Sequence, residues 1–224
     1  DVYKRQNMNI LAVIMIAALC VFFYLGFSFI LIKNRKKDAT HLLFLGMLIT
    51  LVGMAVSCVL AYSAAAKDAH IFWFRWTITF LLIYMALATH FCISLTGLVK
   101  LTRIHILLLY SPVPVLLFKH WTSFIYIKEF VRTNAVWLLS PHPVDAWFYV
   151  LSAYLAGYTI LSLIFLFLWM RRAVTNKKRR QARILFFTLL VTFLAATSEG
   201  LLIPSLTGYY SFALGPIAIA FWIT

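Results

Sequence analysis

Residues 10–32 read ILAVIMIAALCVFFYLGFSFILI, a run without a single charge, and the basic segment KNRKK follows at 33–37. An apolar run of this length can cross the hydrocarbon core of a bilayer as one α-helix. A cleaved secretory signal would have a basic front and a shorter apolar core. The segment therefore predicts a permanent transmembrane helix.

The composition of the whole chain points to the same class. Of 224 residues, 64% are hydrophobic and 12% are charged, and the mean hydropathy is +0.94. A soluble domain is about 45–50% apolar and about 25% charged. These values exclude a soluble enzyme, a disordered tail and a disulfide-stapled secreted domain. Because Cys20, Cys58 and Cys92 all fall inside apolar runs, we expect no structural disulfide.

Further apolar runs predict an all-α membrane protein, a bundle of seven transmembrane helices. After the first span they cover about 42–66, 71–95, 104–118, 147–170, 184–203 and 212–224, the last of them cut short. The fourth span is the weakest, and its end at 118 or beyond is left open. It carries Pro112 and Pro114, which a transmembrane helix tolerates where neighbouring groups satisfy the freed carbonyls.

Both ends of the sequence suggest a fragment. Residues 1–6, DVYKRQ, match the translated end of a sequencing-library adaptor and are expected to be foreign to the protein. The native start would then be Met8 or lie upstream. The seventh span stops at Thr224 within an apolar run. We therefore expect residues 7–224 to be a seven-helix domain that precedes a missing cytoplasmic domain.

Lysine and arginine counts predict the orientation, because cytoplasmic loops are enriched in these residues. With the N-terminus outside, the inner loops hold thirteen: Lys33, Arg35, Lys36, Lys37, Lys100, Arg103, Arg171, Arg172, Lys177, Lys178, Arg179, Arg180 and Arg183. The outer side holds five: Lys67, Arg75, Lys119, Lys128 and Arg132. The basic 171–183 segment is interpreted first as this topology signal, with binding of anionic lipid as the secondary interpretation. A nucleic-acid partner is not expected.

The long outer connection, roughly 119–146, is the candidate ligand-binding loop. Its aromatic residues would suit the membrane interface, and a long loop is also often functional. Trp121, Arg132 and Trp137 are the candidate ligand contacts. His120 and His142 lack a carboxylate or thiolate partner, so no metal site is expected.

Polar residues inside the spans are few. Small residues on one face of the second span predict close packing against a neighbouring helix: Gly46, Thr50, Gly53, Ser57, Ala61 and Ala64. His90 is expected to form a hydrogen bond with a neighbouring helix. Glu199 continues a face begun by Thr188 and Thr192 and is expected to point into the bundle.

Arg75 and Glu199 form the candidate intramembrane pair. Each is expected near the outer end of its span, at a similar depth, and a lone charge there would be costly. A direct ion pair could then act as a latch between two helices. The alternative is that Arg75 extends to the headgroups beside Trp73 and Trp76.

Four segments resemble the N-terminal seven-helix sensor region of bacterial histidine kinases. They are His70–Arg75 (HIFWFR), Ser94–Gly97 (SLTG), Arg179–Arg183 (RRQAR) and Phe212–Pro216 (FALGP). The resemblance covers nearly all of residues 8–224. It implies a sensory input domain of a bacterial inner-membrane protein in a two-component system, working as a homodimer through its output domain. That output domain is a histidine kinase or, in other members, a diguanylate cyclase.

Other classes stay open. The segment has no catalytic constellation and no cofactor motif, so any enzymatic activity would belong to the missing domain. A transporter or channel fragment is the main rival, although the Pro-containing fourth span has no evident counterpart in a second repeat. A retinal protein would need a lysine in the last helix, and residues 212–224 contain none.

Overall fold

The computed structural model describes residues 38–123, 130–133, 136–139 and 146–197. Helices form most of this part: α2 (Ala39–Ser63), α3 (Lys67–Thr96), α4 (Arg103–Tyr110), α5 (Pro112–Thr122), α6 (Ala146–Arg172) and α7 (Asn176–Thr197). Two short strands, β1 (Phe130–Thr133) and β2 (Val136–Leu139), lie between α5 and α6.

Four helical segments in the described residues are long and apolar enough to cross a membrane. They are Ala39–Ser63, Lys67–Thr96, Arg103–Thr122 and Tyr149–Arg172. Each matches an expected span, and together they make the chain a helical membrane protein. The expected spans 10–32 and 212–224 lie outside the described residues, as does the end of 184–203, which begins within α7.

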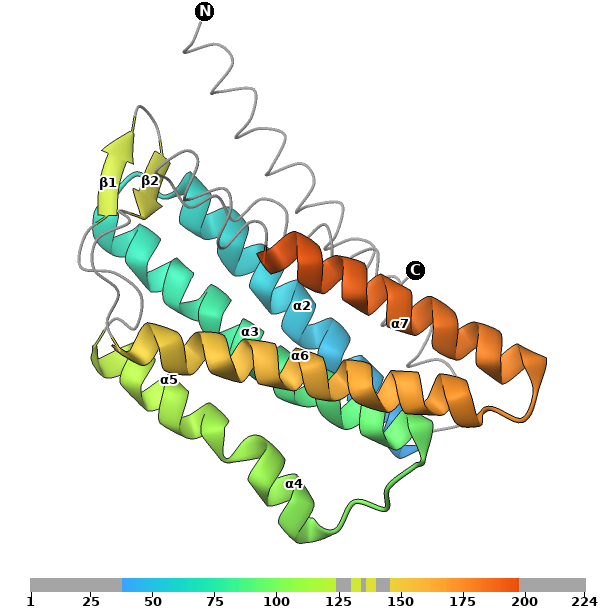
Figure 1. Cartoon of the computed structure of the whole chain (residues 1–224). Coiled ribbons are helices and arrows are strands. Elements are labelled where there is room, and N and C mark those ends of the chain that lie inside the picture. The colour runs from blue at the N-terminus through green and yellow to red at the C-terminus, as the bar shows by residue number, and fades with distance from the viewer. Residues whose placement is uncertain (1–37, 124–129, 134–135, 140–145, 198–224) are drawn as a thin grey trace, which may run out of the picture.

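The helices run back and forth between two ends of the molecule (Figure 1). We call the end that carries the two strands and the α2–α3 connection the hairpin end, and the opposite end the basic end. α2 and α3 form an antiparallel pair, α5 and α6 pack on α3, and α7 packs on α6. The core lies along α3 in two clusters, one around Leu48, Leu51 and Cys92 and the other around Ile78, Leu82 and Leu151.

Small residues bring α2 and α3 together, as the sequence predicts. A Cβ atom placed on Gly53 would lie 2.5 Å from Cζ of Phe80, so only glycine leaves room for that ring. One turn further on, the Thr77 hydroxyl donates to Ser57 Oγ at 3.0 Å. Near the end of α2, the His70 ring nitrogen Nδ1 lies 2.7 Å from the carbonyl oxygen of Ala61. The stripe is therefore a packing surface.

Local sequence signals set the ends of α2 and α3. The Asp38 carboxylate accepts a hydrogen bond from the backbone N–H of His41 at 2.8 Å and caps the start of α2. At the end of α3, Gly97 adopts a left-handed conformation with φ of 60°, which glycine reaches without steric cost. The segment Ser94–Gly97 thus closes its helix as expected.

The fourth span is longer than 104–118 and is broken in the middle. It continues to Thr122, and it is divided at Ser111 into α4 and α5. Pro112 has no N–H for the carbonyl of Leu108, and the Ser111 hydroxyl donates to that oxygen at 3.0 Å instead. The Tyr158 hydroxyl of α6 donates to the neighbouring carbonyl of Leu109. A side chain and an adjacent helix therefore supply the donors at the break, as expected for a proline inside a membrane span.

The all-α class is confirmed for the described residues, which also contain one short hairpin that the sequence did not predict. β1 and β2 pair in antiparallel register, with Phe130 opposite Leu139 and Thr133 opposite Val136. The sequence pattern was dominated by long apolar periodicity, and strands of four residues carry too short an alternation to be recognised against it.

Candidate functional site

Trp121 anchors an aromatic junction between α5 and α3 at the hairpin end. The residue belongs to the last turn of α5, whereas the sequence placed it in the outer loop. Its indole N–H donates to Thr79 Oγ1 at 3.1 Å. The Trp76 ring lies edge-on at a centroid distance of 5.4 Å, and the Phe72 ring does so at 6.3 Å. The junction is therefore held by one hydrogen bond and several ring contacts.

Arg75 lies in the same junction. Its guanidinium carbon is 5.7 Å from the centroid of the Trp121 ring, within the range of a cation–π interaction. The fully buried ring of His120, the residue before Trp121, lies beside Arg75. Of the two interpretations offered for Arg75, neither anticipated an aromatic partner from α5. Glu199 lies outside the described residues, so the structure does not test the Arg75–Glu199 pair.

This arrangement of side chains can recognise an anionic or aromatic group. A half-buried guanidinium is less hydrated than one in water, so its attraction for a ring face or an anion is stronger there. Phe72, whose ring contacts Trp121, is 46% exposed. The region, which we call the Arg75–Trp121 junction, consists of Phe72, Arg75, Trp76, Thr79, His120 and Trp121.

The other two candidate ligand contacts face each other across the hairpin. Arg132 of β1 and Trp137 of β2 are direct register partners. These two positions, 57 and 62 residues after Arg75 in the sequence, are thus brought to the same end of the molecule. The two strands lie near the end of α2 (Figure 1).

A second polar cluster lies midway along the bundle, and its hydrogen bonds between α3 and α6 were not predicted from the sequence. The Ser162 hydroxyl of α6 donates to Thr89 Oγ1 of α3 at 3.0 Å, and Thr89 donates in turn to the carbonyl of Tyr158 at 3.2 Å. The Tyr154 hydroxyl donates to the carbonyl of Leu82 at 2.8 Å. The i, i+4 spacing of Tyr154 and Tyr158, and of Tyr158 and Ser162, was the sequence signal for this face of α6.

His90 has the role that the sequence predicts. Its Nδ1 atom is 3.2 Å from the hydroxyl oxygen of Tyr110, the last residue of α4. The contact joins α3 to α4 beside the break at Ser111. The histidine therefore serves to connect neighbouring helices.

Side chains that could bind a metal ion do not cluster in the described part of the chain. Across residues 38–123 and 146–197, no group of three or more histidine, cysteine or acidic side chains lies close enough to hold a metal ion. Cys58 and Cys92 are both buried and are not joined in a disulfide. His142 lies outside the described residues, so the pair that it would form with His120 is not tested.

Comparisons with known proteins give the chain no relative: no family model, no curated protein and no solved structure matches it.

Proposed function

We propose that the chain is the transmembrane input region of a bacterial sensory protein, in first place a sensor histidine kinase. In this proposal seven helices cross the inner membrane, the N-terminus lies outside, and a cytoplasmic output domain follows the seventh helix and forms a homodimer. The stimulus reaches the Arg75–Trp121 junction from the outer face or from within the membrane. The resemblance of His70–Arg75 and Ser94–Gly97 to that family is the starting point.

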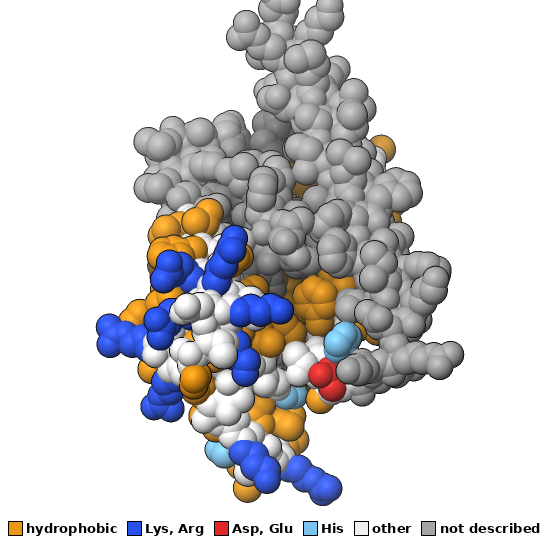
Figure 2. Space-filling view, turned by 90° about the vertical axis from the view of Figure 1, so that its right-hand side faces the viewer, with side chains coloured by type: hydrophobic (Ala, Val, Ile, Leu, Met, Phe, Trp, Pro, Cys, Tyr) orange, Lys and Arg blue, Asp and Glu red, His pale blue; other side chains and the backbone are white. Residues whose placement is uncertain are grey.

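The charge distribution over the described helices supports the orientation. Arg171 and Arg172 end α6, Lys177 and Lys178 begin α7, and Lys100 stands in the α3–α4 connection, so these cations all lie at the basic end. Figure 2 looks at this end and shows lysine and arginine side chains spread over it. Because cytoplasmic ends of membrane helices are rich in such residues, we assign the basic end to the cytoplasm.

The single observation that carries the sensory function is the position of α3. This helix runs without interruption from the Arg75–Trp121 junction to the basic end and packs against α2, α4, α5 and α6. Signalling requires an element that has two positions. Binding of the ligand must change the free-energy difference between these positions. A displacement of α3 at Arg75 would also move the contacts of Thr89 and His90, which join it to α6 and α4. α3 is thus the physical connection from one membrane face to the other.

The experiment is to attach the full chain to a cytoplasmic histidine-kinase output domain and to record phosphorylation-dependent reporter output in cells. We expect Arg75→Gln and Trp121→Ala to change basal output about fivefold or more, the usual size of an allosteric coupling. Lys67→Gln is the matched control, because it removes an exposed positive charge from the same helix and the same end. Output that is unaffected by either junction variant, at equal expression, would contradict the proposal.

The Arg75–Glu199 latch is retained as part of the proposal. Arg75→Gln and Glu199→Gln should each shift basal output, and the effect of the double variant should be markedly less than the sum of the two. Strict additivity would remove the latch and leave the junction with Trp121 as the relevant contact of Arg75.

One observation favours a transporter or channel as the second candidate. The α4–α5 span is interrupted at Ser111, and transporter sites are built from broken helices. Such breaks come in corresponding pairs, whereas the described helices α2, α3 and α6 are each continuous. Reading the gene beyond Thr224 discriminates the classes. Kinase or diguanylate-cyclase motifs would favour a sensor, and further spans beyond the seventh would favour transport.

A further inference from the structure

Among the described residues, the basic end carries many more positive than negative side chains. In the described residues they come from the α3–α4 connection, α4, α6 and α7: Lys100, Arg103, Arg171, Arg172, Lys177, Lys178, Arg179, Arg180 and Arg183. Among the same residues, the acidic side chain of this end is Asp38, and its carboxylate already accepts from the backbone and ring nitrogens of His41, both at 2.8 Å. These exposed charges are therefore available to an anion from outside the protein.

Two of the cations have partners within the protein. The guanidinium of Arg171 lies 4.8 Å above the Phe167 ring, and Arg179 donates to the carbonyl of Ala173 at 3.3 Å. The other cations of the end are exposed. Helix electrostatics do not account for those on α7, because the first turns of a helix carry the positive end of its dipole and disfavour lysine and arginine. Their position suits an external anion.

Apolar side chains stand directly among these cations. Val174, in the short α6–α7 connection between Arg172 and Lys177, is 95% exposed. Ile104, Leu107 and Leu108 on α4 are exposed by 68%, 69% and 65%. Soluble anions and nucleic-acid phosphates would bind the cations but would leave these apolar side chains exposed to water. A phospholipid offers both partners, a phosphate for the cations and acyl chains for the aliphatic side chains.

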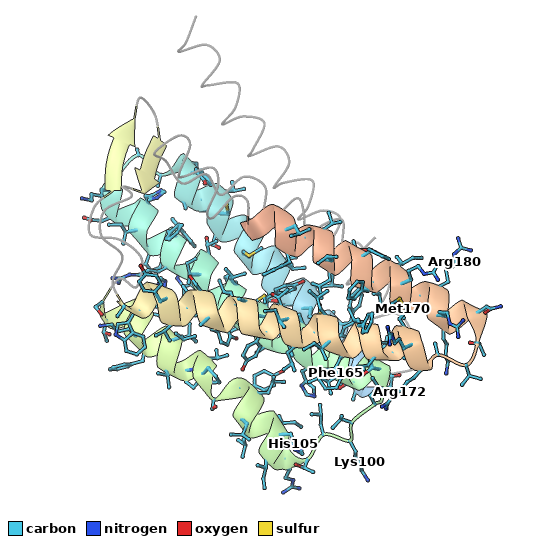
Figure 3. The ribbon with its side chains drawn as sticks, viewed as in Figure 1. Lys100, His105, Phe165, Met170, Arg172 and Arg180 are labelled. Carbon is cyan, nitrogen blue, oxygen red and sulfur yellow. The ribbon has the colours of Figure 1, made fainter. Side chains whose placement is uncertain are left out.

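The geometry of α4 and α6 indicates where one lipid would lie. The two helices meet at the contact of Tyr158 with Leu109 and diverge from there toward the basic end (Figure 1). Figure 3 shows Lys100 in the α3–α4 connection, His105 at the start of α4, and Phe165 and Arg172 on the part of α6 from which α4 has diverged. Cations thus stand on both sides of the divergence.

We propose that the basic end binds an anionic phospholipid of the bilayer, with its phosphate at Lys100 and Arg172 and an acyl chain along the exposed apolar side chains of α4. The proposal requires that the chain lies in a membrane, and it is independent of the sensory function. It gives the basic charges a ligand as well as a topological role.

The test uses the full chain, purified and reconstituted into vesicles of phosphatidylcholine with a fraction of phosphatidylglycerol. Both leaflets have the same composition, so the orientation of the protein does not affect the result. Spin-labelled phosphatidylglycerol and spin-labelled phosphatidylcholine report the relative affinity of the protein for each lipid by electron paramagnetic resonance. We expect the protein to favour phosphatidylglycerol severalfold.

The variant Lys100→Gln/Arg172→Gln should lower this preference severalfold, to near equal binding of the two lipids, because each cation near an anionic surface contributes to the affinity. Lys67→Gln/Lys119→Gln is the matched control, since it removes the same charge from the hairpin end and should leave the preference unchanged. Equal losses in the two double variants, or none in the first, would overturn the proposal. Loss of the preference on adding inorganic phosphate at constant ionic strength would also overturn it, because the site would then bind a free anion.

Leu107→Asn on α4 tests the apolar part separately. It keeps every charge and should weaken the binding of the labelled phosphatidylglycerol, because a polar side chain then meets the acyl chain. Unchanged binding in this variant would refute the proposed position of the lipid along α4.

Discussion

At the residue scale, Gly53 sets how closely α2 and α3 approach. Replacement of Gly53 by valine would drive a Cβ atom into the Phe80 ring, and we expect a loss of about 1–3 kcal/mol in the free energy of unfolding. Gly157→Val is the control, since that glycine is also helical and a Cβ atom there meets no atom within 4 Å. Unfolding in mixed micelles of sodium dodecyl sulfate measures both variants. Equal stability of the two would refute the steric argument.

Asp38 makes the start of α2 sensitive to pH. The hydrogen bonds from His41 lower the pKa of this exposed carboxyl below its ordinary value. A carboxylate with a depressed pKa stabilises the folded state above its unfolded pKa, and the contribution is lost as the pH falls through the folded pKa. We therefore expect the stabilisation by the cap to be complete at neutral pH, to begin to fall below about pH 4, and to be lost as the pH falls through the lower pKa of the folded state.

Hydrogen exchange of the His41 amide measures this cap directly. At neutral pH the amide should be protected in the parent chain and exchange faster in Asp38→Ala, because the side-chain acceptor is gone. Asp68→Ala is the control, because Asp68 lies at the start of α3 and does not cap α2. Equal protection of His41 in the parent and in Asp38→Ala would contradict the assignment.

At the element scale, the broken α4–α5 span depends on donors from outside its own backbone. The Tyr158→Phe variant removes the hydroxyl that reaches the carbonyl of Leu109, at a cost of about 0.5–1.5 kcal/mol. Ser111→Ala removes the donor to Leu108 and should cost a similar amount. Because both donors serve the same turn, we expect the double variant to lose more than the sum of the two.

The unfolding transitions of these variants provide the measurement. Tyr154→Phe is a useful comparison, since its hydroxyl donates to Leu82 in the middle of the unbroken helix α3. The Leu82 carbonyl also lies within the regular hydrogen-bonding pattern of α3. Loss of the Tyr154 hydroxyl should therefore lower the free energy of unfolding by less than loss of the Tyr158 hydroxyl. A larger loss for Tyr154→Phe than for Tyr158→Phe would show that the break does not depend on α6.

At the scale of the whole molecule, the two ends differ in charge and should lie on opposite sides of the membrane. A reporter that is active only in the cytoplasm should be active when fused after Lys178 and inactive when fused after Arg132. Activity at both positions, or the reverse pattern, would overturn the proposed orientation and with it the receptor interpretation. The lipid preference of the basic end would be unaffected by that result.

The sequence by itself determined the membrane class and the places of the four membrane-length helices in the described residues. Apolar runs of about twenty residues specify spans wherever they occur, because each backbone polar group must be satisfied within its own helix in a bilayer. Three further features were predicted from the sequence for a related reason. They are the small residues of α2, the glycine that ends α3 at Gly97, and the role of His90. Each is a local pattern with one physical consequence.

Only the tertiary structure decided which polar groups meet. Trp121 lies against Thr79 and Arg75, 42 and 46 positions away, and Ser162 meets Thr89 across 73 positions. Uniformly apolar helices do not specify their partners or rotations, since nearly every face is compatible with lipid. Packing and a few hydrogen bonds make that choice, and they also fix the strand register that sets Arg132 opposite Trp137. The spans therefore follow from hydropathy, whereas the junction at Arg75 exists only because α3 and α5 pack together.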